Sequence, residues 1–125
     1  MKICKEDSIM LKSTAGERTK TDVEHVYGGA GYMTKELLIT PEQCGEHCRM
    51  FSRITLKPNC EIGHHEHHDE AEVYYILSGN GMYEEDGQSI PVEAGDVTYC
   101  GDGHGHGLKN TGDTELAMAA LILKK

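Results

Sequence analysis

The chain of 125 residues contains no tryptophan, only three prolines and relatively few basic side chains. It also has no apolar run that approaches the roughly 20 residues of a membrane-spanning helix, so a membrane role is not expected. Its 12 basic and 21 acidic side chains give a formal charge of −9, which would repel a phosphate backbone, and no basic stripe is present. The composition therefore excludes nucleic-acid binding from the expected functions.

The amino terminus lacks the apolar centre of a secretory signal, because residues 2–7 already carry four charged side chains. The five cysteines are odd in number and irregularly spaced, which is typical of free thiols in a reducing compartment. We therefore expect a cytoplasmic protein. Cys44 and Cys48 flank His47 and could belong to a zinc clip. Their spacing is wider than Cys-x-x-Cys and no second half follows, so free surface thiols are the favoured interpretation.

Short apolar runs broken by glycine, proline, asparagine and aspartate indicate many short strands, and the length is that of a single domain. Residues 1–21 carry little periodicity and predict an irregular arm, with one short strand near Ser8–Leu11. Thr40 is placed to cap a helical turn that begins at Pro41. The later strands are expected at residues 34–40, 50–56, 73–77, 81–85, 88–92, 97–100, 108–110 and 116–123.

Two hairpins are expected among these strands. Residues 73–77 and 81–85 are separated by Ser78-Gly79-Asn80, and Asp86-Gly87 is a strong signal for a turn into residues 88–92. Many short strands with almost no helix predict an all-β fold, either a β-sandwich or a small barrel.

Half of the eight histidines fall within residues 64–68. His65 and His67 lie two positions apart, so an extended chain directs both imidazoles to one face, where they can bind one metal ion. Glu72 opens the next apolar run and offers a third ligand, and the segment His104-Gly105-His106 can supply a fourth. An affinity tag or low-complexity tract is disfavoured, because the histidines lie mid-chain between two strand-like segments.

The spacing of these residues resembles the two sequence motifs of the cupin superfamily. In the first motif two histidines, a glutamate and a glycine recur at fixed intervals, here His65, His67, Glu72 and Gly79. The second motif of glycines, a histidine and an asparagine is matched by Gly95, Gly103, His106 and Asn110. Gly101 stands where that motif has proline, and Asn59 stands where the first motif begins with glycine. The resemblance covers residues 56–123.

The resemblance implies a small antiparallel jelly-roll β-barrel with an N-terminal arm. Residues 1–48 would form the arm and first strands, and residues 49–125 the barrel core with both motifs. It also implies one divalent metal bound by His65, His67, Glu72 and His106. Because Gly101 loosens the loop before it, His106 could be replaced as a ligand by His104. The mixed nitrogen and oxygen donors suit manganese, iron, nickel, cobalt or zinc.

Three imidazoles and one carboxylate leave two positions of an octahedron open for a ligand. We therefore expect a metal-dependent cupin that chelates a small oxygen-bearing metabolite, a carboxylate or a hydroxy or oxo acid. A role as an enzyme, such as a decarboxylase or dioxygenase, is favoured, with Glu70 or Tyr74 as candidate catalytic bases. A sugar or sugar-phosphate isomerase and a non-catalytic small-ligand binder or sensor remain as alternatives, and so does a metal that merely stabilises the fold.

Cationic side chains near the motifs are scarce. Cupins that resemble oxalate decarboxylases carry an arginine three residues before the first motif histidine, where this chain has Ile62, and this absence disfavours oxalate chemistry of that kind. Residues 60–108 contain no lysine or arginine, which disfavours a phosphosugar ligand. Arg53 could reach the pocket if it faces inward, and Cys100 could line it.

A homodimer is also expected. Both faces of the strands at residues 73–77 and 116–123 are largely apolar, yet the interior of one barrel can bury only one of them. Similar cupins pair sheet against sheet and exchange their amino-terminal strands, so the arm before Pro41 would contribute to this interface.

Overall fold

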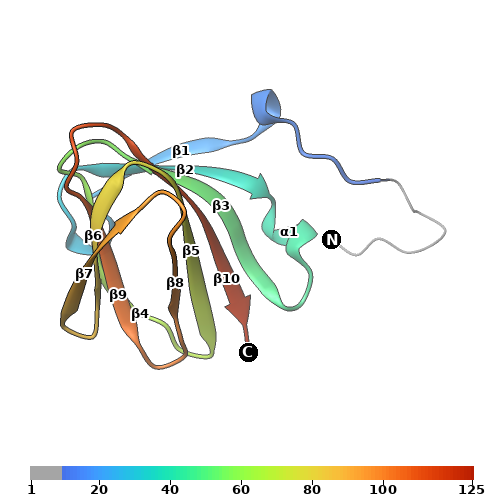
Figure 1. The fold of residues 1–125 in the computed structure, drawn as a ribbon. Coiled ribbons are helices and arrows are strands. Elements are labelled where there is room, and N and C mark those ends of the chain that lie inside the picture. The colour runs from blue at the N-terminus through green and yellow to red at the C-terminus, as the bar shows by residue number, and fades with distance from the viewer. Residues whose placement is uncertain (1–9) are drawn as a thin grey trace.

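The computed structural model describes residues 10–125. The strands, each given with its bounds, are β1 (Lys20–Glu24), β2 (Tyr32–Ile39), β3 (Cys48–Leu56), β4 (Glu61–Glu66), β5 (Glu70–Ser78), β6 (Asn80–Glu85), β7 (Gln88–Glu93), β8 (Val97–Cys100), β9 (Gly105–Asn110) and β10 (Leu116–Lys124) (Figure 1). The short helical segments are η2 (Ala15–Glu17), η3 (Val26–Gly28) and α1 (Pro41–Cys44). None of the described helices is long and apolar enough to cross a membrane.

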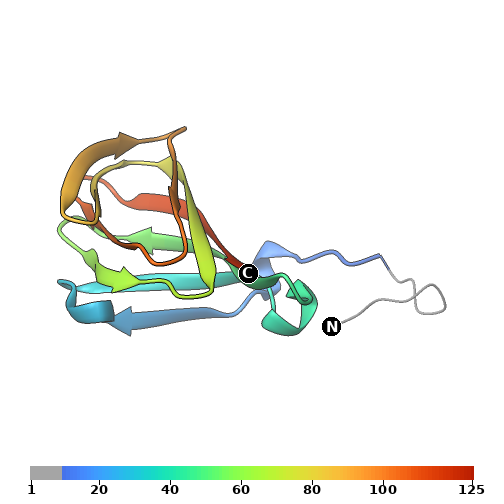
Figure 2. The same cartoon turned by 90° about the horizontal axis from the view of Figure 1, so that it is seen from below.

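The strands form two antiparallel sheets. The six-stranded sheet has the order β1-β2-β3-β10-β5-β8 and the four-stranded sheet has the order β4-β9-β6-β7. In Figure 2 the blue and cyan strands β1 and β2 lie on one side of the molecule, and β7 lies on the other. Within residues 10–125 no ladder joins the two sheets. The jelly-roll prediction is therefore confirmed as a β-sandwich, and the barrel is not closed.

Side chains alternate between the core and the surface along the strands, as the period of a strand requires. On β3 the buried positions are Met50, Ser52, Ile54 and Leu56, and the positions between them are more exposed. The four-stranded sheet supplies the other side of the core through residues such as Ile62, Tyr83 and Leu108, which come from β4, β6 and β9. Tyr74 and Tyr83 meet edge to face across this core, with ring centroids 6.3 Å apart.

The hairpin predicted between residues 73–77 and 81–85 is wrong. β5 pairs with β10 and β8, whereas β6 pairs with β7 and β9 in the other sheet. The chain turns from one sheet to the other at Gly79, whose φ is +83°. A Cβ there would lie 2.7 Å from the Glu115 carbonyl oxygen, so the corner requires glycine.

The second predicted hairpin is confirmed. β6 and β7 pair across Asp86 and Gly87, whose φ values of +50° and +87° are those of a tight primed turn. The helical turn α1 is also confirmed, and Thr40 caps it in a capping box with Gln43.

The N-terminal arm holds a strand that the sequence did not predict. β1 is polar apart from Val23, so it shows no apolar alternation, yet it pairs with β2 along its full length. Of the strand expected near Ser8–Leu11, residues 8 and 9 lie outside the described part of the chain, and residues 10 and 11 belong to no strand. Residues 10–19, which precede β1, extend beyond the edge of the sheets (Figure 1).

Candidate metal centre

Four of the predicted ligands meet between the two sheets. His65 on β4 is the direct cross-strand partner of His106 on β9, so both side chains leave the same face of the four-stranded sheet. Glu72 enters from β5 of the six-stranded sheet, and His67 follows the end of β4. His67, Glu72 and His106 are buried. The sequence thus predicted a cluster that the fold assembles from three strands and one loop.

The donor atoms of the cluster converge on one point. Glu72 Oε1 lies 2.9 Å from His106 Nε2, 3.1 Å from His67 Nε2 and 3.3 Å from His65 Nε2. The Nε2 atoms of His67 and His106 are 3.1 Å apart. Ligands at about 2.1 Å from a metal and at right angles to each other are separated by about 3.0 Å, so these distances fit neighbouring positions of an octahedron.

The other ring nitrogen of each histidine has its own partner. His65 Nδ1 lies 2.9 Å from the Gly63 carbonyl oxygen, which can only accept a hydrogen bond. His67 Nδ1 lies 3.1 Å from Glu70 Oε1. Both contacts favour the tautomer that carries its proton on Nδ1, which leaves the Nε2 lone pair for a metal.

His106 is held by a chain of two hydrogen bonds. Its Nδ1 lies 3.0 Å from the Tyr83 hydroxyl oxygen, and that hydroxyl donates to Glu85 Oε1 at 2.6 Å. Because the hydroxyl proton is directed to Glu85, the oxygen accepts from His106 Nδ1. With their protons on Nδ1, all three imidazoles would present Nε2 lone pairs to the same place, where a cation would offset the repulsion between the lone pairs of His67 and His106. In the metal-free protein the Nε2 atoms instead make the short contacts to the Glu72 carboxylate.

The charges of the cluster also suit a divalent metal ion. Burial alone would raise the pKa of Glu72, but hydrogen bonds from His106, His65 and His67 outweigh it and lower that pKa, so the carboxyl is ionised. Burial lowers the pKa of His106 and keeps its imidazole neutral, although the Glu72 carboxylate opposes this. A neutral imidazole beside an ionised carboxylate is the state that a divalent metal requires.

A cavity of about 260 Å³ adjoins the donor atoms. His65, His67 and Glu72 form part of its wall, and Tyr27 stacks on the His65 ring at a centroid distance of 4.2 Å. Two cations that the sequence interpretation missed, Lys35 and Arg49, also line it. Both lie outside residues 60–108, so a search for cations near the motifs could not find them.

Glu70 and Tyr74, the candidate bases, both lie at the cluster. Arg49 donates two hydrogen bonds to the Glu70 carboxylate at 2.7 and 2.8 Å, and these, together with the His67 contact, hold the pKa of Glu70 below its usual range. Tyr74 is buried and stacks on His106 at 4.7 Å. Burial and then the neighbouring Glu72 raise the Tyr74 pKa well above 10, so the phenol keeps its proton.

The remaining candidates contribute no donor atom to the cluster. His104 is exposed and bonds to Asp86, so it does not replace His106 in the cluster. Arg53 is not in the cavity lining, since its neighbours Ser52 and Ile54 on β3 take the inward positions. Cys100 is buried outside the cavity lining, and burial raises its thiol pKa to about 12.

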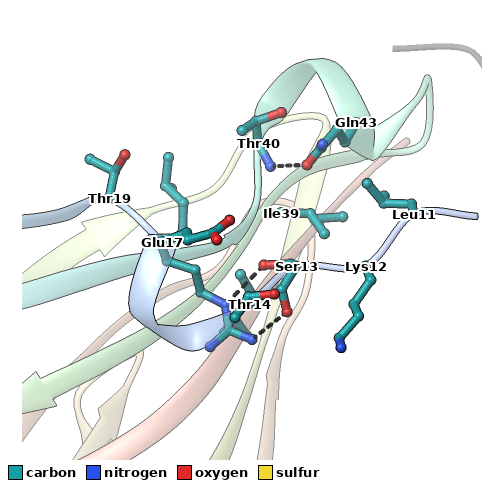
Figure 3. Close-up of a pocket in the computed structure, with 12 residues that line it drawn as sticks. Leu11, Lys12, Ser13, Thr14, Glu17, Thr19, Ile39, Thr40 and Gln43 are labelled. Carbon is teal, nitrogen blue, oxygen red and sulfur yellow. Dashed lines mark hydrogen bonds between the residues drawn. The ribbon is translucent and has the colours of Figure 1, made fainter.

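A separate hollow of about 180 Å³ lies under the N-terminal arm (Figure 3). Leu11, Ser13 and Thr14 of the arm face Ile39 across it, and the close-up also shows the hydrogen bond from the Thr40 backbone to Gln43. None of its lining residues is a histidine or cysteine. This hollow therefore offers no comparable metal-binding set.

Comparison with known proteins agrees with this arrangement. Residues 52–122 match the model of the cupin domain. The chain belongs to the cupin family. A curated relative of this cupin is the oxalate-binding protein of Thermotoga maritima, which is 35% identical over 109 residues, or 87% of this chain and 90% of the relative.

Solved structures of other cupins share the fold. The crystal structure of a predicted oxalate decarboxylase from Thermotoga maritima aligns with a TM-score of 0.88 at 33% identity, over 92% of this chain and all of that one. KdgF from a Halomonas species aligns with a TM-score of 0.74 at 14% identity, over 94% of this chain and 96% of that one. The similarity to KdgF, at 14% identity, concerns the fold alone.

Proposed function

We propose that this cupin binds one divalent metal through His65, His67, Glu72 and His106 and chelates a small carboxylic acid on it. The observation that carries the proposal is that the Nε2 atoms of three histidines point at the Glu72 carboxylate, while each Nδ1 atom has a partner elsewhere. The donor set suits manganese, iron, nickel, cobalt or zinc. When bound, such an ion would supply positive charge and open positions for two ligand oxygens.

The cavity beside the cluster supports an acidic ligand. Lys35 and Arg49 both line its wall, where Glu70 offsets the charge of Arg49 and leaves that of Lys35, and a relative of this cupin carries the name oxalate-binding protein. The absence of an arginine at Ile62 argued against an oxalate-like ligand on sequence grounds. Lys35 offsets that argument, because it brings to the same cavity a cation from β2 that, unlike Arg49, is not paired with Glu70.

Binding without turnover is a second candidate, and the state of the two candidate bases favours it. Glu70 is engaged by Arg49 and His67, and the Tyr74 phenol keeps its proton. In this form the protein would hold an acid as a carrier or sensor. The catalytic alternative keeps Tyr74 as a proton donor to the ligand and Glu70 as the group that orients His67.

Isothermal calorimetry tests the proposal directly. Oxalate and a small 2-oxo acid should bind the metal-loaded protein and should not bind after the metal has been stripped by a chelator. Recovery of the acid unchanged, followed by NMR over time, would favour the binder, and its consumption would favour an enzyme. Binding that is equally tight without metal, or binding of a neutral sugar only, would overturn the proposal.

A homodimer fits the outer face of the six-stranded sheet. Tyr75 and Leu77 on β5 and Val97 and Tyr99 on β8 expose between 40% and 62% of their surface there. A contiguous apolar face of this kind is typical of an interface. Light scattering should give a mass of two chains at micromolar concentration, and Tyr99→Glu should reduce it to one. A wild-type mass of one chain would contradict the dimer.

A further inference from the structure

We propose that Lys35 anchors a second anionic group of the ligand, so that the cavity selects acids with a carboxylate at each end. One end would be chelated at the metal cluster and the other would pair with the Lys35 ammonium. This inference rests on the proposed function and names the ligand class that the same site takes.

Lys35 faces the cavity from the far wall. On β2 it shares a face with the buried Met33, and its cross-strand partner on β3 is the buried Ile54. All three residues line the cavity together with the metal cluster. Lys35 therefore places a cation on the inner face of the sheet, where an unpaired charge is costly unless an anion joins it.

No described carboxylate neutralises this cation. None lies within ion-pair distance of the Lys35 ammonium, whereas the other cation of the wall, Arg49, is already matched by Glu70. Glu72 offsets only half the charge of a divalent metal. A metal-loaded cavity thus carries two positive charges in excess, which a dianion would balance and a monoanion would not.

The size of the cavity also favours a ligand longer than oxalate. β2 and β5 are separated by β3 and β10, so the walls that bear Lys35 and Glu72 are three strand spacings apart, or roughly 14 Å along the sheet. The cavity of about 260 Å³ would hold roughly nine water molecules by their share of liquid volume. Met50, Ile54, Ile62 and Ile122 line the space between the two ends and suit a short methylene chain.

Two acids of matched shape test this inference by calorimetry on the metal-loaded protein. They are 2-oxoglutarate and 2-oxopentanoate, in which a methyl group replaces the distal carboxylate. One charge-assisted hydrogen bond should make 2-oxoglutarate bind roughly tenfold to hundredfold more tightly. Lys35→Met should remove that preference while it leaves the metal content unchanged. Lys20→Met, on the exposed edge strand β1, is the control and should keep the preference.

The outcomes separate the two proposals. If both acids bind the wild type equally, the Lys35 inference is overturned and the proposed function stands. The same holds if Lys35→Met keeps its full metal content and the full preference. If the metal-loaded wild type binds neither acid nor oxalate, the proposed function falls and the inference falls with it. Equal binding of the two acids by the wild type would overturn the inference even if Lys35→Met does not fold.

Discussion

Removal of the Tyr83 hydroxyl should weaken metal binding without touching a ligand. Tyr83 is buried, accepts from His106 Nδ1 at 3.0 Å and donates to Glu85 at 2.6 Å. In Tyr83→Phe the His106 N–H loses its acceptor inside the protein, where the imidazole has no exposed surface. The ring is then free to turn or to change its tautomer, and the Nε2 lone pair is no longer fixed on the cluster.

The size of this effect follows from two terms. Loss of an outer partner of a metal-binding histidine costs roughly tenfold to hundredfold in metal affinity. The unsatisfied buried N–H should also lower the free energy of unfolding of the metal-free protein by about 1–3 kcal/mol. That corresponds to a melting temperature lower by roughly 4 °C for each kcal/mol.

The assay is a metal titration against a competing chelator, combined with calorimetric melting of the metal-free protein. Tyr99→Phe is the matched control for metal affinity, because Tyr99 is 62% exposed on β8 and the loss of its hydroxyl should leave that affinity unchanged. If Tyr83→Phe binds metal as tightly as the wild type while it melts earlier, the hydroxyl has only a structural role. That result would refute the reasoning about the His106 tautomer.

Two further predictions concern protons and packing. Hydrogen bonding to Glu72, and then to Glu70, raises the pKa of His67 above its ordinary value of 6.5 in the metal-free protein despite burial. A metal must displace that proton, so metal affinity should already fall as the pH decreases through a His67 pKa above 6.5; titrations that show equal affinity at pH values of about 5 and 8 would contradict this. Asn110 is buried, donates to the Leu56 and Thr114 carbonyl oxygens at 2.8 Å each and accepts from the Gly112 N–H at 2.9 Å. Asn110→Ala should therefore lower the free energy of unfolding by about 2–4 kcal/mol in chemical denaturation while the metal content stays near that of the wild type, and a loss of metal from a folded variant would show that Asn110 also shapes the site.

The cluster of His65, His67, Glu72 and His106 could be predicted from the spacing of residues in the sequence. His65 and His67 alternate along an extended chain, and the two spaced motifs bring His106 and Glu72 into the same interpretation. The turn at Asp86-Gly87 is equally local, since its sequence alone selects the backbone geometry. These features require no knowledge of which strands pair.

The errors arise from contacts between segments distant in the chain. The sequence around Gly79 predicts a hairpin turn. Only the packing of Gly79 against the Glu115 backbone shows that the chain passes from one sheet to the other there. Arg49 lies next to the inward-facing Met50 and should point outward by alternation. It reaches the cavity because the β3–β10 ladder shifts register between Met50 and Cys48, a bulge that redirects its side chain.

The most direct test of the account is the metal content of purified protein, measured by elemental analysis. The wild type should hold one divalent ion per chain, and His65→Ala or His106→Ala should lose most of it. His68→Ala is the matched control, because its exposed imidazole pairs only with Glu66 in the described part of the chain and should leave the metal content unchanged. A His68→Ala protein without metal, beside a His65→Ala protein that keeps it, would contradict the proposed ligand set.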